Sequence, residues 1–184
     1  MSIPNFLTLL RIALIPVLIG VFYLPLSWAN ILSTAVFALA AITDWFDGYL
    51  ARRWHQTSAF GAFLDPVADK LVVAVALVLL VEKHPTPWMV LPAAVIIGRE
   101  ITVSALREWM AEIGQRAKVA VSNVGKIKTT AQMTALLMLL YYKPLFGLPI
   151  YEIGFVLLYI SAILTLWSML VYLQAALPIL LTRE

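Results

Sequence analysis

The stretch DWFDGYLARRWHQTSAFGAFLDPVAD, residues 44–69, holds every aspartate of a chain of 184 residues. These aspartates are Asp44, Asp47, Asp65 and Asp69, and the chain around them is 62% apolar. An ionised aspartate at membrane depth costs at least ~2.5–3.5 kcal/mol, and carboxylates packed together repel one another. Because a bound cation removes both penalties, the stretch predicts a cation site framed by apolar helices.

The composition indicates an integral membrane protein, with a mean hydropathy of +0.93 and 12% charged residues. The absence of cysteine excludes disulfides and thiolate metal sites. We expect an all-α bundle of six transmembrane helices, forming a single domain over residues 1–184. The first helix lacks a preceding basic region and an evident cleavage site, so we expect it to be retained. The predicted spans are Phe6–Leu24, Asn30–Arg52, Gly61–Val81, Pro87–Ala111, Ser122–Tyr142 and Pro149–Ala176.

Basic residues predict how the spans are oriented. The turns after the second and fourth spans are rich in arginine and lysine, whereas the opposite turns hold only Lys83 and Lys143. Cytoplasmic loops carry the excess of basic residues in membrane proteins. We therefore expect both termini and a polar cavity to face the cytoplasm.

The spacing of the four aspartates predicts that they meet at one level of the membrane. One pair is three residues apart and the other is four apart, so each pair shares a helical face. At 1.5 Å per residue all four lie within about 12 Å of the inner ends of the second and third spans. We expect these spans to form a hairpin with a turn near residues 55–59.

Oxygen-only ligands favour hard cations such as Mg²⁺ or Mn²⁺. Four carboxylates from two helices are enough to hold two such ions, an arrangement that clamps a phosphate during transfer. Small residues beside the aspartates leave room for a bulky ligand. The alternative is that the aspartates form ion pairs with membrane arginines, for which the sequence offers Arg52, Arg99 and Arg107.

The same spacing resembles a family signature. Eight positions match the pattern D-x2-D-G-x2-A-R-x8-G-x3-D-x3-D, which is typical of CDP-alcohol phosphatidyltransferases: Asp44, Asp47, Gly48, Ala51, Arg52, Gly61, Asp65 and Asp69. The segments IPNFLTLLR, GREITVSALREWMAE and GKIKTTAQM resemble the bacterial branch of this family that uses glycerol 3-phosphate as acceptor. The resemblance covers most of the chain and is weakest after Tyr142.

The resemblance implies a reaction and roles for the motif. A phosphatidyl group would pass from CDP-diacylglycerol to the hydroxyl of glycerol 3-phosphate, with CMP leaving. The four aspartates would hold two divalent cations, Mg²⁺ or Mn²⁺, and Asp69 would also act as the general base. The site for CDP-diacylglycerol would comprise Asn5, Thr8, Arg11, Gly48, Ala51, Arg52 and Gly61. The family also implies a homodimer in the bacterial inner membrane.

A second charged group follows on the later spans. Arg99 lies roughly 18 Å from the inner end of the fourth span at 1.5 Å per residue, and an arginine at that depth needs an anion. Its partner is either Glu100 or an aspartate, or else the phosphate of the acceptor, which suits arginine geometry. The resemblance favours the phosphate, bound by Arg99, Arg107, Lys126 and Lys128.

Simpler roles stay open for several of these cations. Lysines at an inner interface commonly satisfy only the positive-inside bias, and Arg11 has the option of extending to the inner surface. A different acceptor, such as inositol phosphate, would need similar basic groups. Buried acids and bases also mark cation-coupled transporters, although the chain shows neither internal repeats nor matched helix breaks.

Overall fold

The computed structural model describes residues 3–54, 59–113 and 123–181. The described residues form six helices, which confirms the expected number and type of elements. Most boundaries agree with the predicted spans to within three residues, but the last helix continues past the expected end at Ala176. The helices are α1 (Ile3–Phe22), α2 (Ala29–Trp54), α3 (Ala59–Lys83), α4 (Pro87–Glu112), α5 (Asn123–Tyr141) and α6 (Ile150–Leu181).

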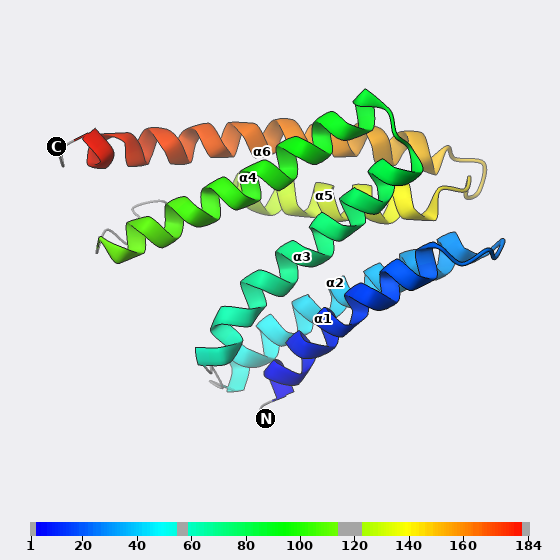
Figure 1. Cartoon of the computed structure of the whole chain (residues 1–184), viewed down its shortest axis with the longest axis horizontal. Coiled ribbons are helices and arrows are strands. Elements are labelled where there is room, and N and C mark those ends of the chain that lie inside the picture. The colour runs from blue at the N-terminus through cyan, green and yellow to red at the C-terminus, as the bar shows by residue number, and fades with distance from the viewer. Residues whose placement is uncertain (1–2, 55–58, 114–122, 182–184) are drawn as a thin grey trace.

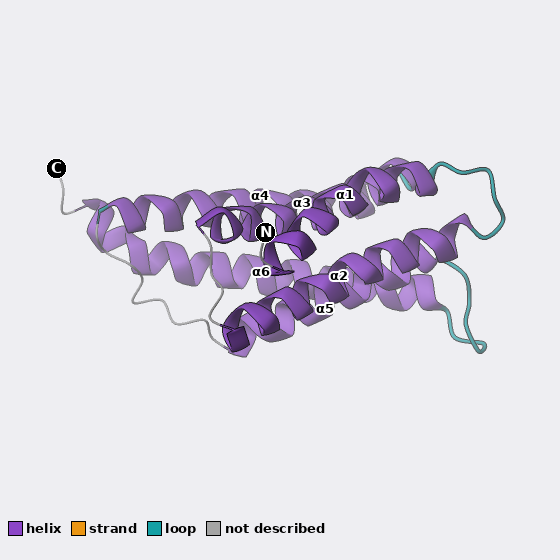
Figure 2. Ribbon diagram, turned by 90° about the horizontal axis from the view of Figure 1, so that it is seen from below, coloured by secondary structure: helices purple, strands orange, loops and turns teal. Residues whose placement is uncertain are grey.

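Successive helices run in opposite directions along the bundle, so the helix termini lie at its two opposite ends (Figure 1). The described loops, residues 23–28, 84–86 and 142–149, lie together at the end that we call the loop end (Figure 2). At the opposite end, here the terminal end, α1 begins and α6 finishes (Figure 1). The aspartates of α2 and α3 lie in the half of the bundle nearest the terminal end.

Helix α1 is central to the first half of the bundle. It packs along both α2 and α3, whereas α2 and α3 contact each other only briefly. The turn expected near residues 55–59 lies almost wholly outside the described residues, and among those that the structure describes α1 makes most of the contact with both helices. Helix α3 also reaches α4 and α5, and α6 packs against α4 and α5.

Length and hydropathy identify two of the described helices as candidate membrane spans. The stretches Pro87–Glu112 and Ile150–Gln174 are long and apolar enough to cross a membrane, with mean hydropathies of 1.6 and 2.1. Among the described residues of α1 and α2, the apolar stretches Phe6–Phe22 and Ala29–Asp44 are shorter than this.

Buried side chains differ between the two halves of the bundle. Toward the loop end the interior is mainly apolar, with Phe37, Leu77, Met89 and Leu136 among its fully buried members and Ser33 as a buried polar exception. Toward the terminal end it contains buried polar groups: Thr8, Arg11, Thr43, Lys128, Gln132 and Thr165. Buried polar groups need partners, so the terminal half is where a site is expected.

Contacts among helix ends and loops stabilise the loop end of the bundle. The ammonium of Lys83 donates to Asn30 Oδ1 at 2.8 Å and lies over the rings of Phe22 and Tyr142. Lys143 donates to the backbone oxygen of Ser27 at 2.7 Å. These contacts join α1, α2, α3 and the α5–α6 loop, and so hold the loop end together while the terminal half carries the charged groups.

A close approach between α5 and α6 depends on Gly154. A Cβ atom at this position would lie 2.7 Å from Met138 Cβ and 3.2 Å from the backbone oxygen of Ala135. We expect Gly154→Ala to force the two helices apart and to destabilise the fold by about 1–3 kcal/mol, the usual cost of overpacking. Thermal unfolding in detergent micelles measures the effect as a lower Tm.

The matched control is Gly20→Ala, because that position is also helical and has no atom within 4 Å of the added Cβ. Alanine is the better helix former by roughly 1 kcal/mol, so this variant should melt at or above the wild-type temperature. A Gly154→Ala protein as stable as the control would contradict the close packing of α5 and α6.

Candidate active site

Two side chains of α1 bring the aspartates of α2 and α3 together. Arg11 Nη1 lies 2.8 Å from Asp44 Oδ1, and the hydroxyl of Thr8 donates to Asp65 Oδ1 at 2.5 Å. Thr8 and Arg11 are three residues apart, so they project from the same face of α1. One helical turn of α1 thus joins the first aspartate of the motif to the third.

The two side chains of this ion pair differ in their exposed fraction. The side chain of Arg11 is 1% exposed, whereas that of Asp44 is 46% exposed. Arg11 therefore does not extend to the surface, and that alternative for its role is wrong. The alternative of ion pairing is correct for Asp44, whose arginine partner among the described side chains is Arg11. The side chain of Arg52, one of the three arginines that the sequence suggested, lies outside the described residues.

Asp69 stands one helical turn beyond Asp65 on α3 and is exposed. Because Asp65 and Asp69 are four residues apart, they project from the same face of α3. Gly61, one turn before Asp65, is buried.

The donor chemistry of this cluster fits a hard divalent cation. Carboxylate oxygens are the ligands that Mg²⁺ and Mn²⁺ prefer, and Asp44 and Asp65 already converge on α1. Among the side chains that the structure describes, no three acidic or histidine groups suffice by themselves to hold a metal ion. Asp47 is not among those side chains, so the metal site stays a prediction.

Several candidate residues lie outside the described side chains. They belong to helices that the structure describes, but nothing is described of their own side chains: Asn5, Asp47, Gly48, Ala51, Arg52 and Lys126. Their assignments to the metal, nucleotide-lipid and acceptor sites remain predictions.

A second charged cluster joins α4, α5 and α6. Glu100 Oε1 accepts from Arg99 Nη1 at 2.8 Å and from Lys128 Nζ at 3.0 Å. Arg99 Nη2 donates to Ser168 Oγ at 3.2 Å. Glu100 is thus the described partner of Arg99, one of the two options that the sequence left open. The cluster has two buried cations and one carboxylate, so it carries a surplus positive charge.

Arg107 lies apart from this cluster. It is exposed, its Nη2 donates to the hydroxyl of Tyr172 at 2.8 Å, and its guanidinium lies 5.1 Å from the centre of that ring. Its charge nevertheless acts on Lys128. Of the four residues predicted to bind the acceptor phosphate, the structure brings Arg99 and Lys128 together and leaves Arg107 at the margin.

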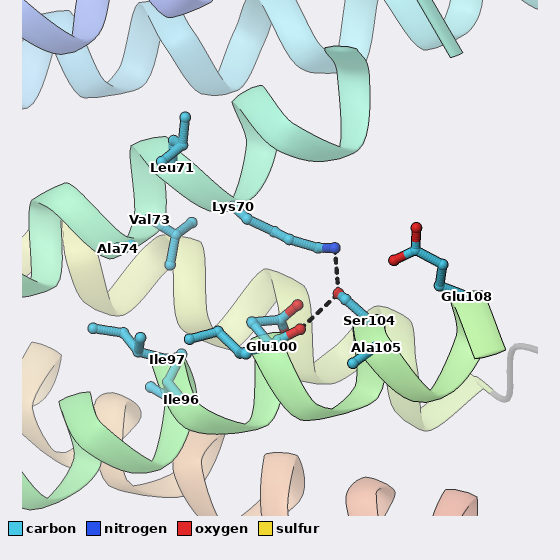
Figure 3. A pocket seen from close by; sticks show the side chains of 11 residues that line it. Lys70, Leu71, Val73, Ala74, Ile96, Ile97, Glu100, Ser104, Ala105 and Glu108 are labelled. Atoms are coloured by element: carbon cyan, nitrogen blue, oxygen red, sulfur yellow. Dashed lines mark hydrogen bonds between the residues drawn. The ribbon is translucent and has the colours of Figure 1, made fainter. Parts of the chain in front are cut away.

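A cavity of about 440 Å³ lies between α3 and α4. Figure 3 shows Lys70 reaching across it to the hydroxyl of Ser104, which in turn donates to the backbone oxygen of Glu100 at 2.6 Å. Apolar side chains such as Ile96 and Ile97 line the rest of the wall. Lys70 follows Asp69 directly on α3, and Glu100 of the second cluster lines the α4 wall, so the cavity borders that cluster.

Sequence reasoning missed three of these polar residues. Ser168 gave no signal, because a lone serine in a long apolar helix is common. Lys70 and Ser104 did offer one: a lysine beside the last aspartate and a serine one turn after Glu100 are polar residues at membrane depth. Only the packing of α3 against α4 shows that these two side chains meet.

Comparison with known proteins identifies the family of this chain. The family model for CDP-alcohol phosphatidyltransferase matches residues 1–167. The chain belongs to this family. A protein from Salmonella choleraesuis (strain SC-B67), named CDP-diacylglycerol--glycerol-3-phosphate 3-phosphatidyltransferase, is 58% identical over 175 residues, covering 95% of this chain and 94% of its own. Proteins of the same name from Pectobacterium atrosepticum and Shigella flexneri serotype 5b are 59% and 55% identical over the same shares.

Membership of the CDP-alcohol phosphatidyltransferase family and the helical structure together make this an all-α integral membrane protein. The matched region contains α1 to α5 and about the first half of α6. It includes the motif aspartates and the charged residues Arg99, Glu100 and Lys128, but not Ser168.

Proposed function

We propose that this protein transfers the phosphatidyl group of CDP-diacylglycerol to a hydroxyl of glycerol 3-phosphate, producing phosphatidylglycerophosphate and CMP. The observation that carries the proposal is the joining of motif aspartates from α2 and α3 through Arg11 and Thr8 of α1. The names of the relatives, 55–59% identical over nearly the whole chain, support the choice of donor and acceptor.

In the proposed reaction, the acceptor oxygen attacks the lipid phosphorus of CDP-diacylglycerol. The bond from that phosphorus to the bridging oxygen of the diphosphate breaks, and CMP leaves with the bonding electrons. Divalent cations bound by the aspartates would neutralise the diphosphate and the charge on the leaving phosphate. The stretch 44–69 holds one histidine and one serine, His55 and Ser58, and both fall between α2 and α3 in the sequence and not beside an aspartate. We propose direct transfer without a covalent intermediate.

Asp69 is the proposed general base. An alcohol is a poor nucleophile until its proton is removed in the transition state. The exposed carboxyl group of Asp69 is accessible to an acceptor hydroxyl, and the proton released on attack would move to one of its oxygens. Asp44 and Asp65 are engaged by donors of α1, which suits them to a fixed ligand role.

The phosphate of the acceptor would bind at the second cluster. Arg99 and Lys128 meet at Glu100 with a surplus positive charge, and guanidinium and ammonium groups bind phosphate through charge-assisted hydrogen bonds. Lys126 and Arg107 would add to this site from its margin. Inositol phosphate offers the same phosphate, so it is the alternative acceptor that a test must include.

We further propose that the terminal end faces the cytoplasm of a bacterium and that the protein lies in the inner membrane as a homodimer. The basic residues of the turns that follow α2 and α4 support this orientation. Cytoplasmic access to the site matches the water solubility of glycerol 3-phosphate and CMP.

Purified protein tests the function directly. It is incubated with CDP-diacylglycerol and Mg²⁺ in mixed micelles and offered glycerol 3-phosphate, inositol phosphate, inositol and serine in separate reactions. We expect CMP release and a phosphatidylglycerophosphate product with glycerol 3-phosphate alone. Equal rates with inositol phosphate would contradict the proposed acceptor, and absence of CMP release with every acceptor would contradict the proposed reaction.

A further inference from the structure

We propose that Glu100 is a positioning residue, which holds Arg99 and Lys128 at the spacing needed to grip the phosphate of the acceptor. This inference rests on the proposed function and extends it, because Glu100 itself would not touch the substrate. A single oxygen of Glu100 accepts from Arg99 at 2.8 Å and from Lys128 at 3.0 Å. The two cationic nitrogens are therefore no more than about 6 Å apart.

The burial of the two cations explains why such a residue is needed. The side chains of Arg99 and Lys128 are only 10% and 6% exposed. Like charges this close repel strongly in a medium of low dielectric constant, so Arg99 and Lys128 would separate without a carboxylate between them. Glu100 neutralises one of the two charges and leaves the other available to an anion.

The three residues come from different places in the fold, which makes the spacing a tertiary property. Arg99 and Glu100 are consecutive on α4, whereas Lys128 belongs to α5, and Ser168 of α6 accepts from the far side of the Arg99 guanidinium. Glu100 therefore ties α4 to α5 at the level of the proposed acceptor site.

The location of Glu100 also links the two charged clusters. It lines the cavity between α3 and α4, and so does Lys70, which follows Asp69 in the chain. Arg99 and Lys128 contact Glu100 from α4 and α5, whereas the proposed base belongs to α3 on the other side of this cavity. This is the order that an acceptor needs if its phosphate is anchored while its hydroxyl reaches Asp69.

The test compares Michaelis constants in Glu100→Gln. Glutamine keeps the size and an acceptor oxygen but removes the charge, so Arg99 and Lys128 should move apart. We expect the KM for glycerol 3-phosphate to rise at least 10-fold, while the KM for CDP-diacylglycerol changes less than twofold. Glu100→Asp keeps the charge with a shorter reach, and we expect it to restore the KM for glycerol 3-phosphate to within about threefold of wild type.

The matched control is Glu112→Gln, which removes an exposed carboxylate from the same helix and should leave both constants unchanged. An unchanged or lower KM for glycerol 3-phosphate in Glu100→Gln would overturn the inference, because the carboxylate would then be idle or a competitor of the phosphate. Equal rises in both KM values would show a purely structural role and would also overturn the inference. So would a Glu100→Asp variant whose KM for glycerol 3-phosphate stays as high as that of Glu100→Gln.

The proposed function can fail separately from this inference. If wild-type protein releases CMP only with another phosphorylated acceptor, the proposed acceptor is wrong, and the same comparison is made with that acceptor. If wild-type protein uses glycerol 3-phosphate and Glu100→Gln is normal, only the positioning role is wrong.

Discussion

Removing divalent cations with excess EDTA is expected to reduce CMP release to background, a loss of more than about 1000-fold. Metal ions supply most of the positive charge that neutralises a diphosphate in such enzymes. The same is expected here, because four aspartates of the motif outnumber its one arginine, Arg52, and Arg11 is already paired with Asp44, so the carboxylates would repel a diphosphate without metal. Initial rates of CMP release before and after chelation measure the effect.

The control for this experiment is EDTA saturated beforehand with Mg²⁺, which should leave the rate unchanged. Adding Mg²⁺ or Mn²⁺ in excess of the chelator should restore the activity, since both ions accept oxygen-only ligands. Activity that persists after dialysis against EDTA would contradict the assignment of the aspartates as metal ligands. The transfer would then need another source of positive charge near the diphosphate.

Asp69→Asn is expected to lower kcat by about 100- to 10,000-fold, the usual contribution of a general base. Asparagine has nearly the same shape, and it cannot accept a proton from the acceptor hydroxyl. The KM values for both substrates should change less than about threefold, because Asp69 is not among the residues proposed to bind them. Steady-state kinetics with glycerol 3-phosphate and CDP-diacylglycerol varied separately provide the measurement.

A titration with Mg²⁺ separates the two roles proposed for Asp69. A lost base cannot be replaced by more metal, whereas a lost ligand mainly weakens metal binding, so that high Mg²⁺ would recover much of the activity. The matched control is Glu82→Gln, which removes a carboxylate near the loop end of the same helix and should behave as wild type. Turnover of Asp69→Asn within threefold of wild type would remove the base assignment.

Much of the fold could be predicted from the sequence because membrane helices are local structures. Their backbone hydrogen bonds form within each segment, so length and hydropathy alone located the helices to within a few residues at most ends. The end of α6 is the exception: it continues to Leu181 through the apolar residues 177–181, although Pro178 is among them.

The acidic half of the candidate site was also predictable. The spacings within Asp44–Asp69 place each pair of aspartates on one helical face, since a helix repeats every 3.6 residues. The partners of these aspartates were not predictable in the same way. Arg11 lies 33 residues from Asp44 in the chain, and no periodicity indicates that α1 packs along both α2 and α3.

The sequence by itself determined six helices, an acidic motif on the second and third, and basic residues on the fourth and fifth. These are properties of single segments, decided by hydropathy, helical period and charge. Only the tertiary structure decided that α1 carries the partners of Asp44 and Asp65, and that Glu100 gathers Arg99 and Lys128. The physical reason is that a buried charge takes as its partner whichever side chain the packing brings within reach, and helix packing depends on the whole chain.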